Sequence, residues 1–170
     1  FPAIFVAIPL SLLLLERAKD GTAAFGYGWW VGFGLFSVGL NWIGFSFTQQ
    51  DNIPAILAPF AIFGLTALLS IYLGLTFWVT WRLRVTGVAR VFVFASSWTF
   101  FEVLRGLLFT GFPWHLVGAV WADWLPVAQS VYFISVYGLS FVTVLAAGSL
   151  VLFVEDRPKA SVVTVAVAGL

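Results

Sequence analysis

The chain has 170 residues, of which 62% are hydrophobic and only 9% are charged. A soluble domain is about half apolar and about a quarter charged, so lipid rather than water must surround most of this chain. The lack of cysteine excludes a disulfide scaffold, a thiolate metal site and a cysteine nucleophile within this stretch, and a net charge of +1 gives no electrostatic basis for binding nucleic acid.

Charged residues divide the chain into long uncharged stretches. A helix needs about 20 apolar residues to cross a bilayer. We therefore predict membrane helices over 22–46, 53–81, 88–112 and 126–154, and incomplete ones over 1–15 and 160–170. The apolar runs are continuous rather than alternating, which argues against strands. The predicted fold is all-α, a polytopic transmembrane helix bundle, and because no methionine is present we expect the chain to be a fragment.

The distribution of basic residues predicts an orientation. Seven of the eight Lys and Arg residues lie around 16–20, 82–90 and 155–159, while the stretches 46–52 and 113–125 contain none. Lysine and arginine are enriched in cytoplasmic loops. We therefore expect the three basic loops in the cytoplasm and the other two loops outside.

Glycines recur along the second predicted helix, and Gly28 and Gly32 share one face of it. Small residues let helix backbones approach closely in lipid. Helix packing is one interpretation of this face, and a groove that holds a lipid chain is the other.

Tryptophans gather near the predicted ends of the helices. Trp42, Trp114, Trp121 and Trp124 fall at outer ends, and an aromatic belt at the membrane interface explains such a distribution.

Glu102 and Arg105 lie well inside the predicted span 88–112, whose inner end is marked by Arg90. They are three residues apart and share a helix face, at a depth where charges cost several kcal/mol unless they are paired or face a polar cavity. Two interpretations stay open: a structural ion pair, or an outward-facing polar pocket in which Arg105 meets a lipid phosphate. The single histidine, His115, has no accompanying ligand cluster, so we expect it to be solvated at the interface and predict no metal or other cofactor.

Residues 101–114, with the sequence FEVLRGLLFTGFPW, resemble the E-x-L-R-G-x-x-F-T-G-F-P-W signature of bacterial apolipoprotein N-acyltransferases. Residues 39–43 (GLNWI), 126–129 (PVAQ) and 136–140 (VYGLS) are similar to other helix ends and cores of that family. The resemblance extends over about residues 21–154. It implies eight membrane helices in the whole protein, with a periplasmic nitrilase-like domain after the seventh, so that 160–170 would begin that helix.

The resemblance also implies a function. The family transfers an acyl chain from a phospholipid to the N-terminal diacylglyceryl-cysteine of an apolipoprotein, in the bacterial plasma (inner) membrane, using a Glu-Lys-Cys triad of the nitrilase-like domain. No triad residue can be assigned in this chain, which would hold lipids and position the catalytic domain. The residues expected to line or brace a lipid entrance are Glu102, Arg105, Gly111, Phe112, Pro113, Trp114, Trp42, Tyr137 and Gly138.

Two alternatives belong to other functional classes. Some actinobacterial relatives pair such a domain with a polyprenol-phosphate mannosyltransferase, which suggests a noncatalytic membrane anchor. A small transporter is the other alternative, and it is weakened because one pair of intramembrane charges is little for an ion path.

Overall fold

The structure is a computed structural model that describes residues 3–43, 56, 58–108 and 114–154. Among these residues there are helices and turns but no strand, which confirms the predicted all-α fold. The elements are α1 (Ile4–Glu16), α2 (Gly21–Gly39), α4 (Ala58–Arg82), α5 (Gly87–Leu108), the 3-10 helix η2 (Val117–Trp121), α6 (Leu125–Ala128), α7 (Val131–Ser149) and α8 (Val151–Val154).

Three helical segments are long and apolar enough to cross a membrane: α4, α5 and the stretch Val131–Val154, which joins α7 and α8. The protein is therefore a membrane protein. α2 has 19 residues and is rich in glycine and tryptophan, which are less hydrophobic than the leucines and valines of the other three. The number of segments that cross the bilayer stays a prediction.

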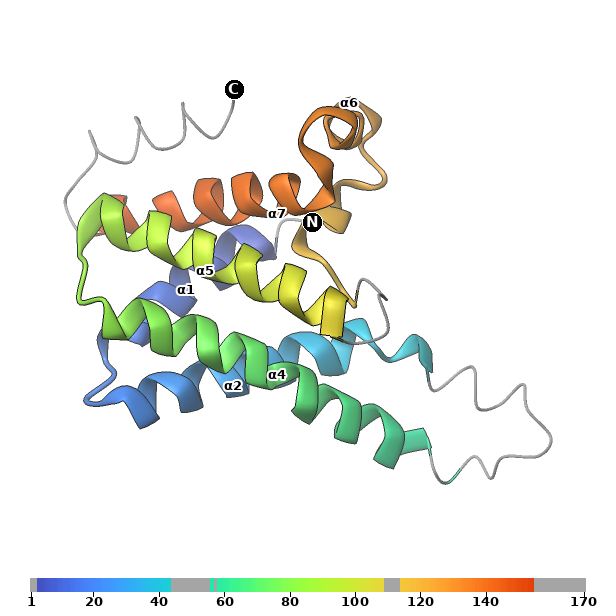
Figure 1. Ribbon diagram of the computed structural model, residues 1–170, viewed down its shortest axis with the longest axis horizontal. Coiled ribbons are helices and arrows are strands. Elements are labelled where there is room, and N and C mark those ends of the chain that lie inside the picture. The colour runs from blue at the N-terminus through green and yellow to red at the C-terminus, as the bar shows by residue number, and fades with distance from the viewer. Residues whose placement is uncertain (1–2, 44–55, 57, 109–113, 155–170) are drawn as a thin grey trace.

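The helices form an elongated bundle in which successive long helices run in opposite directions (Figure 1). The α1–α2 and α4–α5 turns lie together at one end, which we call the basic end because Arg17, Lys19, Arg82 and Arg84 are in or beside these turns. Asp20 begins α2 there, since its Oδ1 accepts a hydrogen bond of 2.7 Å from the amide of Ala23. The opposite end holds η2 and α6, and we call it the η2 end.

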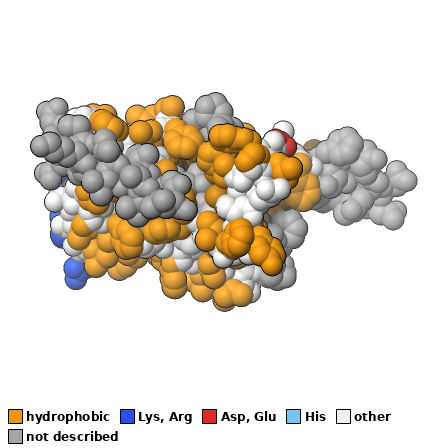
Figure 2. Space-filling model, turned by 90° about the horizontal axis from the view of Figure 1, so that it is seen from above, with side chains coloured by type: hydrophobic (Ala, Val, Ile, Leu, Met, Phe, Trp, Pro, Cys, Tyr) orange, Lys and Arg blue, Asp and Glu red, His pale blue; other side chains and the backbone are white. Residues whose placement is uncertain are grey.

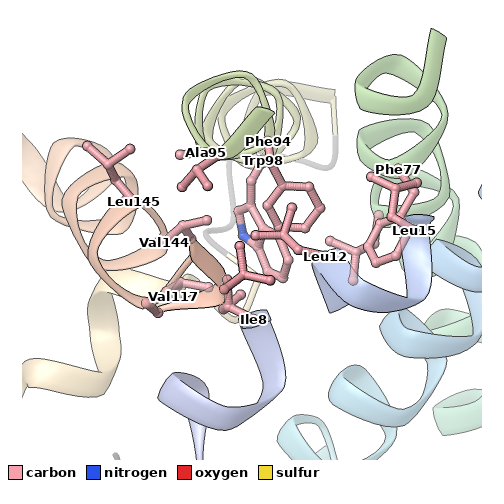
Figure 3. Close-up of a cluster of buried hydrophobic side chains, with 14 of the residues drawn as sticks. Ile8, Leu12, Leu15, Phe77, Phe94, Ala95, Trp98, Val117, Val144 and Leu145 are labelled. Carbon is pink, nitrogen blue, oxygen red and sulfur yellow. The ribbon is translucent and has the colours of Figure 1, made fainter. Parts of the chain in front are cut away.

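The main core surrounds α1, which is short but lies inside the bundle. Figure 3 shows Ile8 and Leu12 of α1 facing Phe94 and Trp98 of α5 and Val144 of α7. These side chains are at most 5% exposed. α1 therefore joins α5 and α7 into one packed unit.

α2 and α4 form a second tight contact, and glycines make it possible. A Cβ atom on Gly28 would lie 2.6 Å from the carbonyl oxygen of Leu73, and one on Gly32 would lie 3.1 Å from the Leu73 Cβ. The indole nitrogen of Trp29 also donates a hydrogen bond of 3.0 Å to the carbonyl oxygen of Ala67 in α4. The space beside Gly28 and Gly32 is thus filled by α4, which supports the packing interpretation over a lipid groove.

The outer surface is largely apolar. Figure 2 shows one face covered mainly by hydrophobic side chains, with basic side chains gathered at one end. Large side chains such as Phe60 (74% exposed) and Phe100 (60% exposed) point away from the core. Water would disfavour such a surface and lipid would not, as expected for a membrane-embedded bundle.

Candidate functional site

The candidate site lies at the η2 end and begins with Glu102 and Arg105 of α5. Each side chain is only 3% exposed, so both charges lie within the bundle. They form no salt bridge with each other among the described contacts, and the structure therefore does not bear out an ion pair. Each instead binds residues that follow the helix.

Glu102 joins its own helix to η2. Its Oε1 atom accepts one hydrogen bond of 3.1 Å from the indole nitrogen of Trp98 and another of 2.9 Å from the backbone amide of Val117. Trp98 lies one turn earlier on the same face of α5, and Val117 is the first residue of η2. The carboxylate thus satisfies a buried amide at the start of a 3-10 helix, a donor that has no partner within that helix.

Arg105 holds the two residues just before η2. Its Nη2 atom donates a hydrogen bond of 2.6 Å to the carbonyl oxygen of Trp114 and lies 3.4 Å from that of His115. The guanidinium carbon is also 4.8 Å from the ring centre of Phe36 in α2, a cation–π distance. The Arg105 side chain therefore links α5 to α2 and to the residues just before η2.

Contacts with α7 fix the other side of residues 114–121, which we call the η2 segment. The amide of Gly118 donates a hydrogen bond of 2.8 Å to the hydroxyl oxygen of Ser140. The indole nitrogen of Trp121 donates a hydrogen bond of 2.7 Å to the hydroxyl oxygen of Thr143. A Cβ atom on Gly118 would lie 2.5 Å from the carbonyl oxygen of Val136, so only glycine fits there. The η2 segment is therefore held between α5 and α7.

His115 lines a cavity of about 420 Å³ at the η2 end. The cavity is lined by Gly39, Leu40, Trp42, His115, Leu116, Ala119 and Val136. The imidazole lies against Gly39, where any Cβ atom would overlap it, and its ring centre is 6.2 Å from that of Phe36. Partial burial, and next the positive charge of Arg105, lower the pKa of His115, so its neutral form is favoured at pH 7.

Tyr137 and Gly138 lie beside a kink in α7. Ser135 has a φ of 62°, which breaks the helix, and its hydroxyl oxygen accepts a hydrogen bond of 3.1 Å from the amide of Tyr137. The Tyr137 hydroxyl reaches α5, where it lies 2.8 Å from the position of a Cβ on Gly106. A Cβ atom on Gly138 would in turn lie 2.9 Å from the Ile134 Cβ, so glycine permits the tight bend.

A second apolar cavity, of about 390 Å³, lies under the kink. Its walls come from α1 (Phe5), η2 (Trp121), α6 (Pro126) and α7 (Ile134, Leu139).

The structure brings several of the predicted site residues together. Arg105 binds Trp114, Glu102 lies one turn away, and Trp42 and His115 line the same cavity. The Tyr137 hydroxyl reaches Gly106 of α5. Gly111, Phe112 and Pro113 lie outside the described residues. No group of three potential metal ligands occurs among the described residues.

Sequence reasoning missed three residues of this arrangement. Trp98 could have been found, because it is four residues from Glu102 and so shares its helix face. Gly118 and Ser140 carry no local signal, since their contact joins residues 22 positions apart. His115 is exposed, as expected, although one side of its ring packs against Gly39 and Phe36.

Comparison with known proteins identifies the family. Residues 1–149 match the family model described as the apolipoprotein N-acyltransferase N-terminal domain. Apolipoprotein N-acyltransferase of Rhodopseudomonas palustris is 38% identical over 149 residues, covering 85% of this chain and 28% of that protein. Proteins of the same name from Bradyrhizobium diazoefficiens and Caulobacter vibrioides are 36% and 32% identical, covering 93% and 94% of this chain and 30% and 31% of their own lengths.

The chain thus spans less than a third of the length of these curated relatives. The match nevertheless runs through α1, α2, α4, α5, η2, α6 and α7, the elements that form the bundle and hold the η2 segment. The chain belongs to the apolipoprotein N-acyltransferase family and corresponds to its N-terminal domain.

Proposed function

We propose that this chain is the membrane part of an apolipoprotein N-acyltransferase. The enzyme would transfer an acyl chain from a phospholipid to the amino group of the N-terminal diacylglyceryl-cysteine of an apolipoprotein. The observation that carries the proposal is the match of residues 1–149 to the N-terminal domain of that family. The nucleophile of the proposed reaction would lie elsewhere in the protein, because this stretch has no cysteine.

Within that function, the η2 segment would form one wall of a lipid entrance. Ligand pockets commonly measure about 300–1,000 Å³ and are mostly apolar. The cavity of about 420 Å³ between Trp42 and His115 is of that kind, and its size suits part of an acyl chain rather than a whole phospholipid. Glu102 and Arg105 would act as bracing residues, since both bind the backbone of the segment that carries His115.

The proposed location is the bacterial plasma membrane, with the η2 end facing outward. The basic end carries Arg17, Lys19, Arg82 and Arg84, and basic residues favour the cytoplasmic side. This orientation would place the cavity at the outer leaflet, where a periplasmic catalytic domain could receive the lipid.

The two alternative functions find less support. The relatives are named as acyltransferases, which favours an enzyme over an anchor for a mannosyltransferase. A transporter needs a polar path, whereas Glu102 and Arg105 are both engaged with neighbouring backbone groups.

The test uses the full-length protein that contains this chain. Purified in detergent with phosphatidylethanolamine or phosphatidylglycerol, it should convert a synthetic diacylglyceryl-cysteine peptide into its N-acylated form, detected by mass spectrometry. A phospholipid-free reaction is the control. Failure to acylate the peptide with either lipid, by a protein that is folded and monodisperse, would contradict the proposed function.

A further inference from the structure

A separate cavity lies at the basic end, far from the η2 segment along the bundle. Its volume is about 310 Å³, and its walls come from the end of α1, the end of α4 and the turn into α5. The lining residues with charged, hydroxyl or aromatic side chains are Glu16, Thr80, Trp81, Arg84, Thr86 and Arg90. Ligand pockets commonly begin at about 300 Å³, so the space suits a headgroup rather than a whole lipid.

The charges around this cavity do not cancel. Arg90 is 6% exposed and forms a salt bridge with Glu16. Arg84 also lines the cavity, and among the described residues of the lining Glu16 is the acidic one. Since Glu16 is already paired with Arg90, the charge of Arg84 favours an anion as the ligand.

Arg84 is held in position although its side chain is exposed. Its guanidinium carbon lies 3.9 Å from the ring centre of Trp81, a close cation–π contact. The indole nitrogen of Trp81 donates a hydrogen bond of 3.3 Å to the carbonyl oxygen of Ala18, which fixes the ring against the α1–α2 turn. A guanidinium that rests on a fixed ring keeps its planar set of N–H donors ready for an oxyanion.

The backbone of Arg84 is unusual for an arginine. Its φ is 54°, in the left-handed region that glycine and asparagine adopt most easily. An L-residue with a Cβ is strained in this conformation. The protein therefore keeps an arginine at a position where glycine would be less strained, which a binding role for its side chain would explain.

The surroundings of the cavity are those of a membrane interface. Leu83 is 55% exposed and Val88 is 40% exposed, on either side of the lining residues 84–86. Beside apolar side chains, the acyl chains of a lipid can lie in the membrane while its phosphate enters the basic cavity.

We propose that this cavity binds a phosphate-bearing anion through the guanidinium of Arg84. The group can come from the headgroup of an anionic phospholipid in the adjoining leaflet or from free phosphate. This site is independent of the acyl-transfer site, so its test uses binding and not acylation.

The experiment is native mass spectrometry of the full-length protein in detergent. Dioleoyl phosphatidylglycerol is titrated against the unsubstituted protein, against Arg84→Gln and against Arg82→Gln. Arg82 is the matched control, because it is exposed at the same end of α4 but does not line the cavity. We expect Arg84→Gln to raise the dissociation constant at least fivefold and Arg82→Gln to change it less than twofold. Arg84→Lys, which keeps the charge but loses the planar donors, should give an intermediate value.

Two further ligands identify the source of the phosphate. Dioleoylglycerol has the same acyl chains without phosphate and should bind at least fivefold more weakly. Displacement of phosphatidylglycerol by millimolar inorganic phosphate would assign the site to free phosphate, and no displacement would assign it to the lipid. Equal weakening by Arg84→Gln and Arg82→Gln, equal binding of dioleoylglycerol, or no binding of either phosphate compound would overturn the proposal.

Discussion

Single side chains explain how two charges remain inside the bundle. A charge at this depth costs several kcal/mol unless polar groups surround it. Glu102 accepts hydrogen bonds from Trp98 and Val117, and Arg105 donates to the carbonyl oxygen of Trp114. Each charge therefore compensates groups that would otherwise be buried without a partner.

Replacing Glu102 tests this compensation. Glu102→Ala leaves the Trp98 indole N–H and the Val117 amide buried without an acceptor, and each such donor costs about 1–3 kcal/mol. Glu102→Gln keeps an acceptor oxygen and removes a buried charge, so we expect it to lower the free energy of unfolding by less than about 1 kcal/mol. Thermal unfolding of the full-length protein in detergent compares the two variants, and equal losses would show that these hydrogen bonds contribute nothing.

The partners of these charges show where sequence reasoning stops. The three-residue spacing predicts that Glu102 and Arg105 share a face, because helix geometry is local. Their actual partners, Val117 and Trp114, lie beyond the end of the helix, and only the path of the chain brings them back. An ion pair is the local expectation, and the fold replaces it with two backbone contacts.

Between helices, the spacing of glycines decides how closely α2 and α4 approach. Gly28 and Gly32 face α4, whereas a Cβ atom on Gly26 or Gly34 would meet nothing within 4 Å. The glycine-rich helix thus has a packed face and an open face. Packing through small residues is a common way for helices to associate in lipid, where apolar side chains alone give little preference.

Alanine substitutions on the two faces of α2 should have opposite effects. Gly28→Ala places a Cβ atom 2.6 Å from a Leu73 oxygen and 2.7 Å from the Phe77 ring, so we expect a loss of about 1–3 kcal/mol or more. Gly34→Ala, the matched control, meets no neighbour and gains up to about 1 kcal/mol of helix propensity. Thermal unfolding in detergent measures both, and similar effects of the two substitutions would contradict the close approach.

The helices differ in how well the sequence predicts them. The span predicted over 53–81 corresponds to α4 (Ala58–Arg82), because a continuous apolar run carries its own signal. The run 126–154 contains α6, α7 and α8 with a kink at Ser135, and nothing in its hydropathy marks that break. At the kink Gly138 closely approaches Ile134, and Gly118 of the η2 segment packs against Val136, a tertiary contact that no local pattern predicts.

Across the bundle as a whole, the two ends differ in chemistry. The basic end has a salt bridge and a cavity lined by arginines, and the η2 end has tryptophans, His115 and two mostly apolar cavities. This polarity agrees with the arrangement of basic residues that predicts the orientation in the membrane.

Cysteine labelling tests the orientation, and the lack of native cysteine in this chain simplifies it. Asp123 and Lys19 are both exposed and belong to opposite ends of the bundle. In intact cells, a membrane-impermeant maleimide should label Asp123→Cys and should reach Lys19→Cys only after the membrane is permeabilised. The unsubstituted full-length protein is the control for cysteines elsewhere, and the reverse labelling pattern would contradict the orientation.

The role of the η2 segment depends most directly on Arg105, which binds Trp114 and contacts Phe36. The decisive measurement is the acylation rate of the full-length Arg105→Ala protein as a function of phospholipid mole fraction in mixed micelles, with Arg82→Ala as the control. If the segment forms a lipid entrance, the KM for phospholipid rises at least tenfold while kcat stays within about threefold of the original. A KM equal to that of the unsubstituted protein, with or without a fall in kcat, would contradict a role for this segment in admitting lipid.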